Sequence, residues 1–69
     1  MHTKLESKLE ELKIVPSRYE RLAETSRMTI TKLRDLVTGK KRINQMEAES
    51  IADGIYTILG KKVEVKEIM

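Results

Sequence analysis

Residues 19–37 read YERLAETSRMTITKLRDLV, and this stretch decides the fold that the sequence predicts. Each half has apolar side chains on one face, and in the second half they follow the helical spacing i, i+3, i+4. Thr29 stands where the second half begins, and its hydroxyl suits a helix N-cap. The stretch therefore predicts two short helices, at about residues 18–24 and 30–38, joined by a tight turn. The inward-facing residues are Leu22, Ala23, Leu33, Leu36 and Val37.

The outer face of the second predicted helix carries side chains that can read DNA base edges. Arg34 can contact guanine through a bidentate fork, Asp35 can accept from cytosine, and Ile30 with the Thr31 methyl can cover a thymine methyl. The alternatives are a solvated Arg34–Asp35 pair and an isoleucine that covers the edge of the core. The layout is that of a helix-turn-helix, which makes sequence-specific DNA binding the leading hypothesis. The predicted base-reading residues are Thr29, Ile30, Thr31, Arg34 and Asp35.

Positive charge is concentrated in one part of the chain. The net charge of the 69 residues is +3, but residues 25–45 hold six basic side chains and one acidic, a local net charge of +5. A polyphosphate partner is attracted by such a concentration, whereas a solvated basic loop is the alternative. Two residues that open the helix before the turn, Ser17 and Arg18, add a helix N-terminus that can hold a phosphate. The predicted phosphate contacts are Ser17, Arg18, Arg27, Lys32, Lys40, Lys41 and Arg42.

The flanking segments complete a small helical domain. Leu5, Leu9 and Leu12 form one helical stripe in residues 3–13. Ser17 with Glu20, and Asn44 with Glu47, match the capping-box pattern, so helices are expected from about residue 18 and behind Asn44. An apolar stripe extends from there to about residue 59. Gly39 and Gly60 are expected helix stops, and Gly54 is expected to permit close packing.

The tail, residues 61–69, changes its hydrophobic period. Val63 and Val65 alternate with charged residues, which is typical of a strand, and a lone strand needs a partner. The partner that we predict is the same tail of a second chain, and a final helical turn through residues 64–68 is the alternative. Tyr56 is either a core residue or a subunit contact. The predicted dimer interface is Tyr56, Val63, Val65 and Ile68.

Composition argues against several other classes of protein. The chain has no cysteine, no phenylalanine and no tryptophan, so thiolate metal sites are excluded and stacking on single-stranded bases would rest on Tyr19 and Tyr56. No nucleophile has a histidine base in view, and no glycine-rich phosphate loop or metal-ligand spacing is present. We therefore expect no enzyme activity, no cofactor and no metal. No apolar run approaches the length of a membrane span, and we expect a cytoplasmic protein.

From about residue 4 to residue 60 the chain resembles the helix-turn-helix family of phage repressors and Cro proteins. The residues that match the family's spacing are Leu22, Ala23, Met28, Thr29, Leu33, Leu36, Gly39 and Lys40. Arg27 stands where the family usually has glycine, and Val37 where it often has glutamate. The resemblance implies that residues 29–35 enter the major groove. Residues 59–65 also resemble the C-terminal strand of the antitoxin branch, which joins two subunits in a small sheet.

The expected fold is mostly α: one compact four-helix helix-turn-helix domain over residues 1–69 with a short C-terminal β-strand. The expected function is that of a DNA-binding transcriptional regulator that represses by occupying an operator. We expect a homodimer, because one recognition helix reads only a few base pairs. A protein–protein module, such as an antirepressor or an antitoxin with a toxin partner, is the alternative. The basic segment favours DNA, while the acidic residues 46–69 suit a protein partner.

Overall fold

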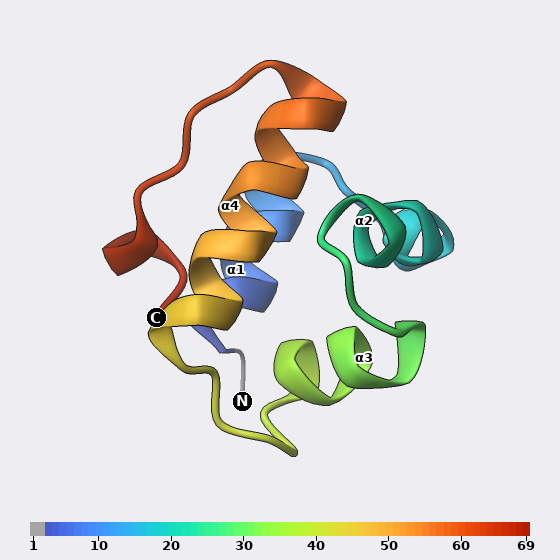
Figure 1. Ribbon diagram of the computed structural model, residues 1–69, viewed down its shortest axis with the longest axis vertical. Helices are drawn as coiled ribbons and strands as arrows, with labels where there is room; N and C mark the ends of the chain where they lie inside the picture. Colours follow the sequence, from blue (N-terminus) through green and yellow to red (C-terminus); the bar gives the residue numbers. More distant parts are fainter. Residues whose placement is uncertain (1–2) are drawn as a thin grey trace.

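This computed structural model describes residues 3–69, in which four α-helices and two turns of 3-10 helix are joined by loops (Figure 1). The predicted mostly helical fold is confirmed. The helix over residues 30–38 and the helix from behind Asn44 to residue 59 have the predicted bounds, and the first two helices differ from prediction by one or two residues at their ends. In chain order the elements are α1 (Lys4–Glu11), η1 (Pro16–Arg18), α2 (Tyr19–Thr25), α3 (Ile30–Thr38), α4 (Gln45–Leu59) and η2 (Val65–Glu67).

Side-chain caps begin three of the four α-helices. The Thr29 hydroxyl accepts the backbone N–H of Lys32 at 3.1 Å, and this predicted N-cap of α3 is confirmed. The predicted capping box of α4 is also formed, because Asn44 Oδ1 accepts the N–H of Glu47 at 2.8 Å and Glu47 Oε1 accepts the N–H of Asn44 at 3.0 Å. Thr3 caps α1 and also donates to the carbonyl of Val37 at 2.7 Å, which ties α1 to the end of α3.

The predicted capping box of Ser17 and Glu20 is wrong. Pro16 begins the turn η1 one residue earlier, since its fixed φ suits the first helical position. Ser17 therefore lies inside η1 instead of in the extended conformation that an N-cap needs. The residue before α2 is Arg18, and α2 has no side-chain cap.

Helix α2 packs on α4 and α3, while α1 packs on α3 and on the C-terminal turn. The expected close approach at Gly54 is confirmed, since a Cβ placed there would overlap Ser26 Oγ and would lie 3.1 Å from Thr25 Oγ1. Tyr19 belongs to the core and is only 6% exposed, so its ring is not available for stacking on bases. The buried apolar residues are Leu5, Leu9, Ile14, Tyr19, Leu22, Ala23, Leu33, Leu36, Val37, Ala48, Ile51, Ile55, Val63 and Ile68.

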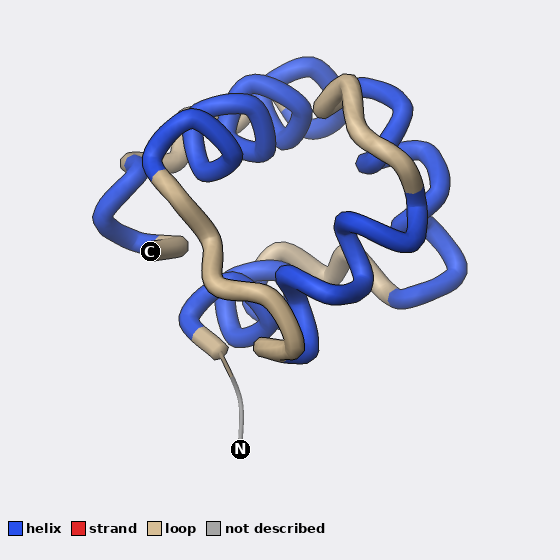
Figure 2. The backbone as a smooth tube through the Cα atoms, turned by 60° about the horizontal axis from the view of Figure 1, so that its bottom comes forward, coloured by secondary structure: helices blue, strands red, loops and turns tan. Residues whose placement is uncertain are grey.

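The expected C-terminal strand is absent from residues 3–69, and Figure 2 shows helices and loops only. The tail instead follows the alternative, a last helical turn: it runs past the end of α4 and finishes in η2. Val63 and Ile68 are buried against the chain's own core, and Val65 packs at its edge. The alternation of Val63 and Val65 that suggested a strand arises because both side chains find apolar partners within the same chain.

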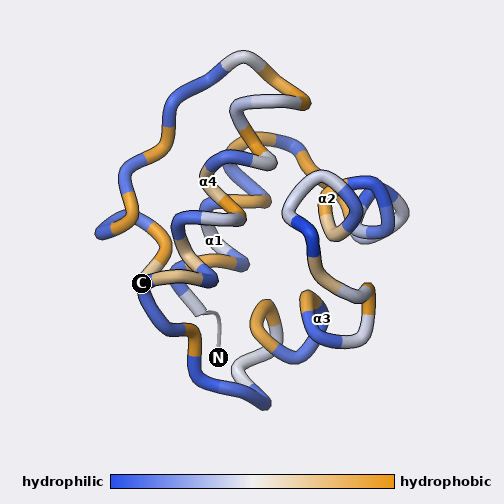
Figure 3. The backbone as a smooth tube through the Cα atoms, viewed as in Figure 1, coloured by the Kyte–Doolittle hydropathy of each residue, from blue (hydrophilic) through white to orange (hydrophobic). Residues whose placement is uncertain are grey.

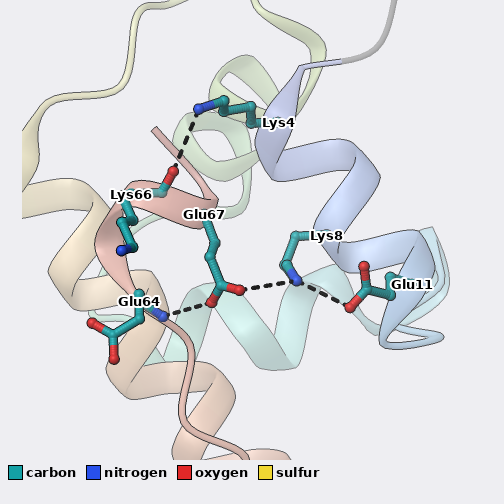
Figure 4. Close-up of polar contacts among 6 residues, drawn as sticks. All are labelled: Lys4, Lys8, Glu11, Glu64, Lys66 and Glu67. Atoms are coloured by element: carbon teal, nitrogen blue, oxygen red, sulfur yellow. Dashed lines mark hydrogen bonds and ion pairs between the residues drawn. The ribbon is translucent and has the colours of Figure 1, made fainter.

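Polar contacts fasten this tail to α1 (Figure 4). The Lys8 ammonium lies between two carboxylates, 3.0 Å from Glu11 Oε2 and 3.6 Å from Glu67 Oε1. Lys4 Nζ donates to the carbonyl of Lys66 at 3.5 Å, and the Glu64 N–H donates to Glu67 Oε2 at 2.8 Å. These contacts hold the tail against α1 of its own chain.

Candidate nucleic-acid interface

The turn between α2 and α3 is built from backbone hydrogen bonds at the end of α2. The N–H of Met28 donates to the carbonyl of Ala23 at 3.0 Å, and the N–H of Arg27 donates to that of Glu24 at 3.2 Å. This pair of hydrogen bonds is the Schellman motif, in which the residue just after the helix C-cap takes the left-handed conformation. Arg27 occupies that position with φ of 60°. The conformation that glycine adopts easily is therefore kept here by an arginine.

Helix α3 buries one face and leaves the other open. Leu33, Leu36 and Val37 are in the core. Of the predicted base-reading residues, Thr29, Thr31 and Arg34 are exposed and Asp35 is half-buried. Ile30 is half-buried and packs against the core, as in the alternative reading of that residue. The exposed surface at the start of α3 is therefore formed by Thr29, Thr31 and Arg34.

The basic loop after α3 stays close to that helix. Gly39 takes a left-handed φ of 84° at the C-cap, and the N–H of Lys41 returns to the carbonyl of Asp35 at 3.1 Å. Lys40, Lys41 and Arg42 are exposed. Figure 3 shows the resulting hydrophilic stretch between the end of α3 and the start of α4. The structure thus brings the loop cations next to the helix that carries Arg34.

Glu47 on α4 joins this basic surface, and the sequence did not indicate it. Its Oε2 lies 3.1 Å from Lys32 Nζ and 3.4 Å from Lys41 Nζ, while its side chain is only 8% exposed. The sequence marked Glu47 as a helix cap alone. No local pattern could have placed it beside Lys32 and Lys41, because the contact depends on how α3 and α4 are placed by their common packing on α2.

Burial raises the pKa of the Glu47 carboxyl, but its hydrogen-bond donors have the larger combined effect. The backbone N–H of Asn44 and the ammonium groups of Lys32 and Lys41 all favour the charged form, so the pKa lies below its usual value of 4.5. Glu47 is therefore a carboxylate at neutral pH. It offsets part of the positive charge that residues 25–45 contribute.

The remaining predicted site residues fall into two groups. Ser17 and Arg18 are exposed in η1, directly ahead of α2, and Arg27 is exposed in the turn. Of the predicted dimer residues, Tyr56 is 57% exposed on α4, so it does not fill the core. Val63 and Ile68 are 8% and 1% exposed, and a dimer could use them only if the tail left its own core.

No protein-family model matches this chain, and no curated protein and no solved structure matches it either. Within residues 3–69, no helix combines the length and the apolar character that crossing a membrane requires. The same residues contain no group of three or more His, Cys, Asp and Glu side chains placed to hold a metal ion. The function is therefore inferred from the surface of α3 and its surroundings.

Proposed function

We propose that this chain is a helix-turn-helix protein that binds double-stranded DNA through α3. The observation that carries the proposal is the exposure of Thr29 at the N-cap of α3, and of Thr31 and Arg34 on α3, beside the basic loop that follows this helix. A hydroxyl or methyl group and an arginine fork are the groups that contact bases in the major groove. The groove is about 12 Å wide and accepts one α-helix, whose diameter is about 10–12 Å.

The surrounding cations are placed to contact the DNA backbone. Lys40 and Arg42 are exposed in the loop after α3, and Arg27 is exposed in the turn before it. Contacts to phosphate position a protein on the duplex, while contacts to base edges select the sequence. The division of roles that we propose is therefore reading by α3 and positioning by the residues at its two ends.

The proposed regulator acts as a homodimer that represses by occupying an operator. One reading helix covers only a few base pairs, and two copies about one helical turn apart give a longer site. The side chain that supports a dimer contact is Tyr56, which is 57% exposed on α4, and Leu59 nearby is 39% exposed. A sheet formed by two tails is a second mode of pairing, which requires Ile68 to leave its buried position.

Selection of binding sites from random duplex DNA tests the proposed function. Arg34→Ala is expected to cost about 1–3 kcal/mol on the selected site and to relax the base preference at one position. Lys40→Ala is expected to weaken selected and random duplexes alike. An equal loss for both variants on both kinds of DNA would contradict the assignment of α3 as the reading helix.

A protein–protein module is the second candidate, such as an antirepressor or an antitoxin. The exposed apolar side chains of α4, Met46 and Tyr56 with Leu59, favour it, because such side chains suit a protein partner. The two candidates differ in their response to salt. Binding to duplex DNA weakens steeply as salt increases, whereas an apolar protein interface responds little.

A further inference from the structure

One carboxylate links three parts of the proposed DNA surface. Glu47 lies in the first turn of α4, Lys32 in α3, and Lys41 in the loop between these helices. Glu47 Oε2 is 3.1 Å from the Lys32 ammonium and 3.4 Å from that of Lys41. Both lysine side chains remain part-exposed, at 40% and 51%, whereas that of Glu47 is 8% exposed.

Helix capping does not account for this arrangement. The capping box uses Glu47 Oε1, which accepts the N–H of Asn44 at 3.0 Å. The other oxygen receives both ammonium groups, and a carboxylate that is largely removed from water needs such partners. The pairing also restrains two long side chains that would otherwise move freely. Glu47 therefore both caps α4 through Oε1 and holds two lysine side chains through Oε2.

We propose that Glu47 is a positioning residue that limits how strongly Lys32 and Lys41 attract DNA phosphates. This inference rests on the proposed DNA-binding function. The two lysines and Glu47 together carry a charge of +1 instead of +2, and a phosphate that approaches either lysine competes with a carboxylate already in contact. The attraction for DNA of any sequence is thereby set below the value that the lysines alone would give.

Other nearby cations provide the comparison within the same surface. Among residues 3–69, Lys40 makes no ion pair, although it is the chain neighbour of Lys41. Glu49 lies on α4 two residues after Glu47 and is exposed, with a hydrogen bond from Gln45 at 3.1 Å. Lys40 and Glu49 thus match Lys41 and Glu47 in charge and region without sharing their contact.

The test compares Glu47→Gln with Glu49→Gln on a random duplex over a range of salt concentrations. Glutamine keeps the size and the Oε1 acceptor of the capping box and removes only the charge. Glu47→Gln is expected to bind the random duplex about 5–10-fold more tightly at 0.1 M salt, with the slope of log K against log salt steeper by about 1. Glu49→Gln is expected to leave the slope unchanged.

A second pair of variants decides the matter if Glu47→Gln does not fold, as judged by circular dichroism. Glu47→Ala keeps the Asn44 cap on the backbone N–H of residue 47 and is expected to make the slope steeper by about 1, whereas Glu49→Ala is expected to leave it unchanged. Equal slopes for the Glu47 and Glu49 variants overturn the inference while the proposed function stands. A wild-type protein that binds no duplex at low salt overturns both.

Discussion

Arg27 holds the turn between α2 and α3 in a conformation that its side chain disfavours. Its φ is 60°, in the left-handed region where a Cβ crowds the following carbonyl oxygen at a cost of about 1–2 kcal/mol. Lys13 adopts the same conformation, with φ of 62°, after α1. Both residues are exposed cations, but only Arg27 lies beside the proposed reading helix. Comparing substitutions at Arg27 and Lys13 therefore distinguishes the effect of backbone strain, which both residues have, from an effect of charge on DNA binding, which is expected at Arg27 alone.

Arg27→Gly is expected to stabilise the fold by about 0.5–1 kcal/mol, because relief of strain exceeds the greater freedom of glycine in the unfolded chain. Lys13→Gly is expected to stabilise by a similar amount. Chemical denaturation measures both. Only Arg27→Gly should also weaken binding to random duplex DNA, and equal DNA binding by the two variants would remove Arg27 from the phosphate contacts.

Gly54 marks a close approach of α4 to the end of α2. A Cβ there would overlap Ser26 Oγ and would lie 3.2 Å from Leu22 Cδ1. Gly54→Ala is expected to destabilise by about 1–2 kcal/mol, since overpacking outweighs the gain of about 1 kcal/mol in helix propensity. Ser26→Ala removes the overlapping hydroxyl, which is buried without a hydrogen-bond partner in residues 3–69. The double variant Gly54→Ala with Ser26→Ala should recover much of the lost stability. Thermal unfolding of the two single variants and the double variant measures this, and a double variant no more stable than Gly54→Ala would contradict the proposed overlap.

At the scale of elements, the tail contributes to the core of its own chain alongside the α-helices. Ile68 is 1% exposed and η2 lies against α1 and α4. Ile68→Ala is expected to reduce the free energy of unfolding by about 2–5 kcal/mol, the usual range for removing a large buried aliphatic side chain. Chemical denaturation measures this loss, and sedimentation should give the same oligomeric state for Ile68→Ala as for the wild type. A shift from dimer to monomer in the variant would instead indicate tails exchanged between two chains.

Two carboxylates that join elements make stability depend on pH. The pKa of Glu67 is lowered chiefly by the backbone N–H of Glu64, aided by Lys8, and that of Glu47 is lowered despite burial. A lowered folded-state pKa adds stability above the unfolded value of about 4.5, and this is lost as the pH falls through the folded value. The free energy of unfolding should decrease from pH 6 to pH 3. Glu47→Gln should show a smaller decrease than Glu49→Gln, and identical decreases would contradict the ion pairs of Glu47.

Local signals predicted the helices well, because caps and stops act within a few residues. Thr29, Asn44 and Gly39 each stand at the boundary that their chemistry indicated. Ser17 failed as a cap because Pro16 started the turn first. The tail failed as a strand because alternation over so few residues also fits a loop that packs two valines on a core. The contact of Glu47 with Lys32 and Lys41 could not be predicted, since only tertiary packing creates it.

At the scale of the whole molecule, the charge that faces a ligand differs from the charge of a sequence window. Residues 25–45 carry +5, but Glu47 lies among their lysines and reduces the net value to +4. If each net charge neutralises one phosphate, log K for duplex DNA should fall with log salt with a slope of about −3 to −4 per subunit. The surface of α3 then adds the base contacts that distinguish one sequence from another.

The salt dependence of binding to duplex DNA tests the central claim most directly. The account predicts measurable binding to a random duplex at low salt and a linear slope of about −3 to −4 per subunit. It also predicts that a selected site is bound at least about 1,000-fold more tightly than random DNA. A flat response to salt, or no duplex binding at low salt, would contradict the claim that α3 and its flanking cations form a DNA-binding surface.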